Sequence, residues 1–236
     1  MSASPTPDEA TRPRRGQSMT RLETFTDAAF AFAAALLAIS IDEVPESYPE
    51  LIEALKDAPA FAASFAILLL FWRAHQTWSD RYGLEDLPSV LLTFGLILVV
   101  MIYVYPLKIM FGAAFNAISN GWLPSSFALE SQAQFRVVLT VYGVGFFMLS
   151  GLISALYLHA WRRRAQLSMH PREAFDTAAE ILAWLIVALF GLLSVALGWL
   201  LPDRHVPIAA WIYCALIIYG PIFDRVQQNR ARRRFG

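Results

Sequence analysis

The sequence predicts an all-α, polytopic membrane protein with six transmembrane helices. Of its 236 residues, 57% are hydrophobic and only 16% are charged, whereas soluble domains have about 25% charged residues. A helix needs about 20 mostly apolar residues to cross a hydrocarbon core of ~30 Å at 1.5 Å per residue. Six segments meet that requirement, and most arginines fall on one of the two sides that six spans create. The net charge of zero gives no reason to expect a nucleic-acid partner.

The six predicted spans divide the chain into a membrane domain, residues 20–226, and two tails. They cover about 20–43, 58–79, 88–111, 133–161, 174–201 and 206–226. Residues 1–19 mix Pro, Ser, Thr and Arg without periodicity, so we expect a disordered tail, and residues 227–236 should form a basic tail. Residues 112–132, rich in Gly, Asn and Pro, should form a loop with room for a short interfacial helix at Trp122. Residues 41–57, with six carboxylates, should form a solvated acidic loop.

Arginine placement predicts the orientation in the membrane. Clusters flank the first span, lie between the fourth and fifth spans and follow the sixth, all on one side of a six-span topology. The positive-inside rule then makes both termini cytoplasmic, in the inner membrane if the host is bacterial. The first apolar run followed by "AIS" also resembles a secretory signal peptide. Glu23 and Asp27 beside the apolar run weigh against cleavage, as does the five-span protein that cleavage would leave.

The first span begins with polar groups, in "RLETFTDAAFAFAAALLAISIDE" (21–43). Thr20 and Glu23 have the spacing of a capping box, which predicts a helix start near Thr20. Asp27 lies at the mouth of the apolar run, where a carboxylate is costly to desolvate. In "FWRAHQTW", Trp72 and His75 lie three residues apart on one face of the second span, and both side chains are suitable donors to a carboxylate. Asp27 is therefore expected to bind one of them, unless it contacts only interfacial water.

Large and small apolar residues alternate in one stripe of the first span. Ala28, Phe32, Ala35 and Ile39 follow one another at helical spacing. Small residues allow close helix packing, so the stripe fits a plain packing surface. It also fits the lining of a narrow apolar pore, if several copies of this helix meet on one axis.

Arg21, Phe25, Thr26 and Asp27, followed by "AAFAFAAALLAISI", resemble the R-x-x-x-F-S-D signature and first helix of the transmembrane protein 175 family of potassium channels. "FWRAHQTW" is similar to the second helix of that family, and "VYP" near residue 105 also fits its pattern. The resemblance covers residues 20 to about 110. It implies six helices, a homo-tetramer when the chain has one repeat, and a pore lined by the first helix without a separate filter loop.

Carried over by position, the resemblance puts the apolar constriction of the pore on Phe32, with Ala28, Ala35 and Ile39 on the same stripe. It makes Arg21, Phe25, Thr26, Asp27, Trp72 and His75 a structural lock for that helix. Two departures are informative. Thr26 replaces the usual Ser and keeps its hydroxyl. Ala35 lacks the hydroxyl that the family usually has there, which weakens the expected selectivity for potassium.

No phosphate loop, zinc-ligand spacing or nucleophile–base pattern is found in the sequence, so we expect neither an enzyme nor a bound cofactor. The expected function is a potassium-permeable cation channel, with K⁺ as the permeant ion and with monovalent cations and the lipid bilayer as partners. Two other classes remain open: a proton-coupled transporter and a non-conducting membrane protein that kept the fold.

Overall fold

The computed structural model describes residues 20–39, 45–125, 127 and 131–235, and every regular element among them is a helix. The helices are α1 (Arg21–Ile39), α2 (Tyr48–Lys56), α3 (Ala58–Tyr82), α4 (Leu87–Ile118), α5 (Gln132–Arg162), α6 (Pro171–Leu200), α7 (Val206–Trp211) and α8 (Ala215–Phe235). Two short 3₁₀ turns, η1 (Asp203–His205) and η2 (Ile212–Cys214), flank α7. Within the described residues, six helical segments are long and apolar enough to cross a membrane. The all-α, six-span prediction is confirmed.

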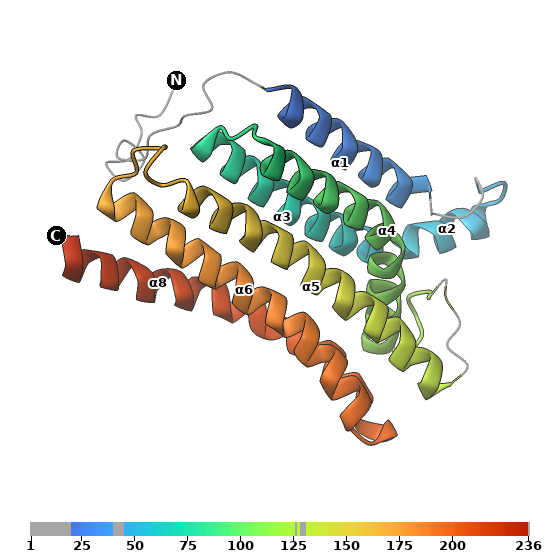
Figure 1. Cartoon of the computed structure of the whole chain (residues 1–236). Coiled ribbons are helices and arrows are strands. Elements are labelled where there is room, and N and C mark those ends of the chain that lie inside the picture. Colours follow the sequence, from blue (N-terminus) through green and yellow to red (C-terminus); the bar gives the residue numbers. More distant parts are fainter. Residues whose placement is uncertain (1–19, 40–44, 126, 128–130, 236) are drawn as a thin grey trace, which may run out of the picture.

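The long helices form one bundle, with α5 near its centre (Figure 1). α5 packs against α3, α4 and α6, α1 packs against α3 and α4, and α8 packs against α6. Figure 1 shows α1 and α8 on opposite sides of the bundle. α1 begins, α3 ends and α8 ends at the same end, where Arg21, Arg81 and Arg232 lie. We call this the basic end.

α5 and α6 approach each other at a pair of glycines. A Cβ atom on Gly191 would lie 2.5 Å from the carbonyl oxygen of Gly143, and one on Gly143 would lie 2.8 Å from the carbonyl oxygen of Gly191. Only glycine leaves room for this contact, because it has no side chain. The backbones of α5 and α6 are therefore in close contact at this point.

α4 extends beyond its predicted end at residue 111. It continues to Ile118, so the first residues of the expected loop 112–132 are helical, and no helix forms around Trp122. Residues 113–118 include three alanines, which are strong helix formers and outweigh the single Asn116. α4 also contains Pro106, which lacks a backbone N–H, and the helix bends along its length (Figure 1).

The sixth span differs from the single helix predicted for residues 206–226. It consists of α7, η2 and α8, and the 3₁₀ turn η2 interrupts the α-helical hydrogen bonds. α8 then runs to Phe235 through most of the predicted basic tail. Arg, Gln and Ala in that segment favour a helix, and no glycine or proline follows Pro221 before Phe235.

The segment between the first two spans contains a helix that the acidic composition did not indicate. α2 begins after Ser47, whose Oγ accepts a hydrogen bond from the backbone N–H of Glu50. Asp57 joins α2 to α3, and its carboxylate lies 3.3 Å from Nζ of Lys108 on α4. This mostly buried ion pair holds the α2–α3 corner against α4. The predicted tail 1–19 and residues 40–44 at the end of the first predicted span lie outside the described residues.

Candidate pore-lining helix and its polar anchor

α1 begins with the capping box that the sequence predicted. Thr20 Oγ1 accepts a hydrogen bond from the backbone N–H of Glu23 at 3.1 Å, and Glu23 Oε2 accepts one from the N–H of Thr20 at 3.5 Å. These bonds satisfy two of the amides that have no partner at a helix start. The side chain of Thr26 is buried and donates to the carbonyl oxygen of Leu22 at 2.7 Å. Thr26 is thus bonded within α1 and not to another helix.

α1 has one buried face and one exposed face. The buried face, which packs on α3 and α4, consists of Thr26, Ala29, Phe30, Ala33 and Leu37. The exposed face contains all four residues of the predicted constriction stripe, Ala28, Phe32, Ala35 and Ile39. Phe32 is 57% exposed and Ile39 is 76% exposed. The described part of a single chain therefore leaves the whole stripe exposed along α1.

Asp27 is bonded to α3 through Trp72. The indole Nε1 of Trp72 donates to Oδ1 of Asp27 at 2.8 Å. His75, the other predicted donor, does not bind Asp27: its Nε2 lies 3.0 Å from Oγ1 of Thr93 on α4, in a buried contact. The two side chains of "FWRAHQTW" thus connect α3 to two different helices.

The other two signature residues have separate surroundings. Arg21 is exposed at the first position of α1. The ring of Phe25 contacts Phe94 of α4 edge-on, with 5.6 Å between ring centroids, and Phe25 is 53% exposed. Phe25 therefore extends the exposed apolar surface from α1 to α4, while Asp27 and Thr26 face the bundle.

α3 carries further inter-helix hydrogen bonds that sequence reasoning missed. Trp78 Nε1 donates to the carbonyl oxygen of Leu156 on α5 at 2.9 Å, and the hydroxyls of Tyr82 and Thr177 on α6 lie 2.8 Å apart. Both contacts are buried. The available signal was a row of side chains with polar atoms, Trp72, His75, Trp78 and Tyr82, at helical spacing in the second half of α3. Their partners lie too far away in the sequence to be found by spacing.

A second missed cluster ties the start of α4 to the end of α5 at the basic end. His159 Nε2 lies 2.9 Å from Oδ2 of Asp86, and Nη2 of Arg163 lies 3.0 Å from the same oxygen. Asp86 also caps α4, because its Oδ1 accepts hydrogen bonds from the N–H and hydroxyl of Ser89. Partial burial raises the pKa of Asp86, but the hydrogen bonds from Ser89 and His159 outweigh it, so the net shift is downward.

Among the described residues, no group of three or more His, Cys, Asp and Glu side chains has the geometry to hold a metal ion. The geometry instead describes a helix with one exposed apolar stripe and, near its start, a hydrogen bond from Trp72 of α3 to Asp27.

Comparisons with known proteins agree with this geometry. The family model described as endosomal/lysosomal potassium channel TMEM175 matches residues 21–106. A protein named potassium channel from Marivirga tractuosa is 30% identical over 229 residues, which are 93% of this chain and 92% of that protein. The crystal structure of the potassium channel MtTMEM175, a variant in complex with a nanobody–MBP fusion protein, superposes with a TM-score of 0.80. Its identity is 28%, over 98% of this chain and 100% of that chain.

A second solved structure shares the fold at lower identity. It is a homolog of the lysosomal potassium-selective channel TMEM175 from Chamaesiphon minutus, with a TM-score of 0.56 and 20% identity over 88% of this chain and 96% of that chain. Because the Marivirga relative matches at 30% identity over nearly the full length of both chains, this chain belongs to the TMEM175 family of potassium channels.

Proposed function

We propose that the chain forms a homo-tetrameric cation channel permeable to potassium, with α1 lining the pore. The observation that carries this proposal is the exposed stripe of Ala28, Phe32, Ala35 and Ile39 on the face of α1 that no other helix among the described residues covers. An alanine-rich face offers little apolar surface to lipid, whereas it allows several copies of α1 to approach one axis. Family membership supports the same function.

Phe32 is the proposed constriction. Phenyl rings from several copies would leave little room for a hydrated ion, and they offer no hydrogen bond to replace the water that an ion loses. Such apolar constrictions block ions by dewetting and conduct when they widen slightly. Ala35, about one turn further along α1, supplies no hydroxyl for a partly dehydrated ion. We therefore propose weak discrimination among monovalent cations.

The Asp27–Trp72 hydrogen bond is proposed to set the rotation of α1. Phe32 follows Asp27 by five residues, which corresponds to about 140° around an α-helix. With Asp27 held against α3 at 2.8 Å, Phe32 points away from the bundle, toward the proposed axis. Rotation of α1 would have to break this bond and move buried Thr26 out of its contacts with neighbouring helices.

We infer that the basic end faces the cytoplasm, by the positive-inside rule. The opposite mouth of the pore would then lie near α2, whose exposed side chains include Glu50 and Glu53. Carboxylates at a pore mouth raise the local concentration of cations. The inferred topology puts both termini on the cytoplasmic side, in a plasma or inner membrane.

Flux from liposomes tests the proposal. We expect wild-type protein to conduct potassium weakly, and Phe32→Ala and Phe32→Asn to raise flux because both widen the constriction or let water wet it. Leu192→Ala is the matched control, since Leu192 is exposed on α6 and far from α1 in the sequence and in the bundle. A conducting wild type with both Phe32 variants unchanged would refute the pore assignment. Flux with fixed proton stoichiometry would indicate a transporter, and no flux in any variant would indicate a non-conducting protein.

Assembly is tested separately from conduction. With Cys214 replaced by serine, a cysteine introduced at Ala28 or Ala35 should cross-link chains in native membranes, because four copies of the stripe would meet on the axis. A cysteine at Leu192 serves as control and should not cross-link. If Ala28 and Ala35 give no linked chains and the solubilised mass is that of one chain, the axial pore is excluded.

A further inference from the structure

The end of α8, where the sequence predicted a basic tail, lies against the start of α6. The rings of Phe235 and Phe175 are in edge-on contact, with 5.8 Å between their centroids. Cζ of Arg234 lies 5.7 Å from the centroid of the Phe175 ring and 5.6 Å from that of the Phe235 ring. Ala231, about one turn earlier on α8, is buried. The last turns of α8 are therefore held on α6.

This contact sets the depth of the end of α8. Phe175 is the fifth residue of α6 and belongs to the predicted span 174–201, whereas Phe235 lies beyond residue 226, where the sixth predicted span ends. Figure 1 shows the end of α8 beside the start of α6. The last turns of α8 therefore run alongside the first turns of a membrane-spanning helix, at the boundary between hydrocarbon and lipid head groups. Arginine side chains at that boundary direct their charged ends toward the head groups.

This part of α8 is strongly basic. Asp224 is the one acidic residue of α8, and it lines the cavity between α6 and α8. On the first two turns of α6, Glu173 is buried and Asp176 is partly buried. Within the described residues, no ion pair joins a carboxylate to any of four exposed arginines of α8: Arg225, Arg230, Arg232 and Arg233. The surface of this segment therefore attracts anions.

Four exposed side chains of α8 form one stripe of hydrogen-bond donors. Arg225 and Arg232 are seven residues apart, which is about two helical turns, so they lie on one face of the helix. Gln228 and Asn229 lie between them on that face. Amide groups donate hydrogen bonds, and guanidinium groups bind phosphate oxygens in bidentate geometry. The stripe is about 10 Å long at 1.5 Å per residue, and its chemistry fits a phosphate-containing head group.

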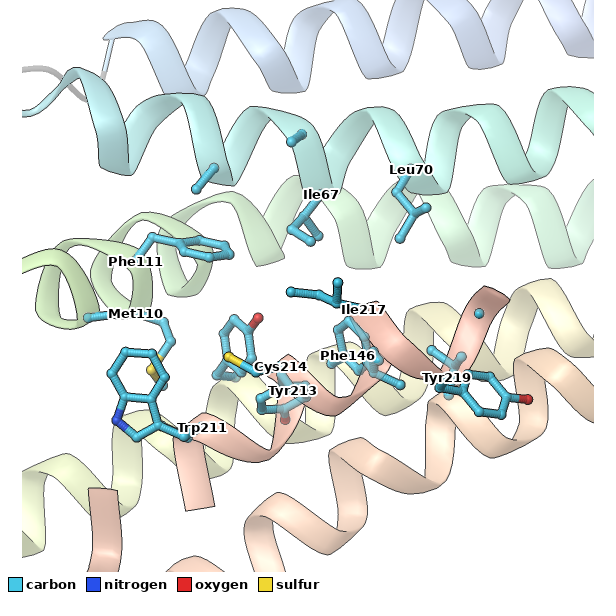
Figure 2. A pocket seen from close by; sticks show the side chains of 18 of the residues that line it. Ile67, Leu70, Met110, Phe111, Phe146, Trp211, Tyr213, Cys214, Ile217 and Tyr219 are labelled. Carbon is cyan, nitrogen blue, oxygen red and sulfur yellow. The ribbon is translucent and has the colours of Figure 1, made fainter. Parts of the chain in front are cut away.

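The middle of α8 borders a cavity. Ile217 and Tyr219 of α8 line it from one side and Ile67 and Leu70 of α3 from the other (Figure 2), and its volume is about 1230 Å³. α8 packs on α6, and this cavity separates the two side chains of α8 from α3. The position of α8 therefore depends on its contacts with α6, and a ligand bound at the arginines would add to them.

We propose that Arg225, Arg230, Arg232 and Arg233 bind the head groups of anionic phospholipids in the leaflet at the basic end. Clusters of four to eight Lys or Arg residues next to a membrane-spanning helix bind such lipids. A soluble acidic protein fits less well, because the contact with Phe175 holds the arginines at the level of the first turns of α6, where lipid head groups already surround the protein. The proposal depends on the protein's place in a membrane and not on whether it conducts ions.

Native mass spectrometry of the full chain tests this proposal. Protein released from detergent micelles with equal amounts of phosphatidylglycerol and phosphatidylcholine, with identical acyl chains, gives the ratio of the two dissociation constants. Each arginine near an anionic surface contributes roughly fivefold to binding. We therefore expect phosphatidylglycerol to bind roughly tenfold or more tightly than phosphatidylcholine, with a preference that falls as salt is added. Equal affinity for the two lipids would overturn the proposal.

Variants assign the preference to α8. Arg225→Gln combined with Arg232→Gln should remove most of it, and Arg225→Lys combined with Arg232→Lys should keep most of it, because the charge is retained. The matched control is Arg162→Gln combined with Arg164→Gln, which removes two exposed arginines at the end of α5. Equal losses in the two glutamine pairs would show that the preference is spread over the whole basic end, against the assignment to α8.

Competition identifies the source of the anion. Inorganic phosphate and polyglutamate, at the same concentration of charge, should leave bound phosphatidylglycerol in place. Displacement by phosphate would overturn the proposal in favour of a site for a soluble anion, and displacement by polyglutamate would overturn it in favour of an acidic protein segment.

Discussion

Replacing Trp72 with phenylalanine removes the hydrogen bond that Trp72 donates to Asp27 at 2.8 Å. Hydrogen bonds to charged groups contribute about 1.5–3 kcal/mol in soluble proteins, whereas inter-helix hydrogen bonds in membrane proteins average about 0.6 and reach about 1.7 kcal/mol. Asp27 is only partly buried, so water takes over part of the lost contact. We therefore expect a coupling between Trp72 and Asp27 of about 1–1.5 kcal/mol, in the upper part of the membrane-protein range because the acceptor is a carboxylate.

A double-mutant cycle measures that coupling. The free energy of unfolding is determined in mixed micelles for Trp72→Phe, Asp27→Ala and the double variant. The control cycle pairs Asp27→Ala with Trp78→Phe, because Trp78 donates to the carbonyl oxygen of Leu156 and not to Asp27. The control should be additive within about 0.3–0.5 kcal/mol. Additive effects of Trp72→Phe and Asp27→Ala as well would refute the anchor and show that water alone holds the Asp27 carboxylate.

Three further changes test other parts of the structure. Gly191→Ala should lower the free energy of unfolding by about 1–3 kcal/mol, because its Cβ would lie 2.5 Å from a backbone oxygen of α5. The control variant Gly151→Ala should be neutral or stabilising, because there is open space around Gly151. Equal losses of stability in the two variants would contradict the close α5–α6 contact. The pKa of Asp86 is lowered in the folded protein, so its stabilisation is present above its unfolded pKa of about 3.9 and is lost as pH falls through the folded value. Asp86→Asn should therefore flatten the acid limb of a stability-against-pH curve, and an unchanged limb would show that Asp86 does not contribute. Ala35→Thr should shift the reversal potential toward that of potassium without a large change in maximal flux. An unchanged reversal potential would show that residue 35 does not determine ion selectivity.

Local and periodic features of the fold were predictable from the sequence. The capping box at Thr20 and Glu23 depends on four consecutive residues, and the exposed stripe of α1 depends on a repeat of 3.6 residues. Both features depend only on residues that are close together in the sequence. The sequence limits the hydrogen-bond donor for Asp27 to Trp72 or His75, because both lie on one face of a single helix. In the structure the two side chains have different partners: Trp72 donates to Asp27 of α1, and His75 contacts Thr93 of α4.

Long-range pairings and helix ends were not predictable in the same way. Asp86 and His159 are 73 residues apart, and Tyr82 and Thr177 are 95 apart, so no spacing rule connects them. Hydropathy locates the apolar part of a helix, but a helix ends where its hydrogen bonds end. α4 therefore runs past its apolar part to Ile118, and α8 runs through the arginines to Phe235.

The order of hydrogen-bond partners along α3 has a consequence for biogenesis. Trp72 binds α1, His75 binds α4, Trp78 binds α5 and Tyr82 binds α6. The partners thus succeed one another along α3 in the order in which the ribosome makes them. A chain emerging into the bilayer satisfies Trp72 at once, since α1 is already made, and each later helix satisfies the next polar side chain toward the end of α3. The set of inter-helix hydrogen bonds made by α3 can therefore be completed only after α6, the fifth span, has been synthesised.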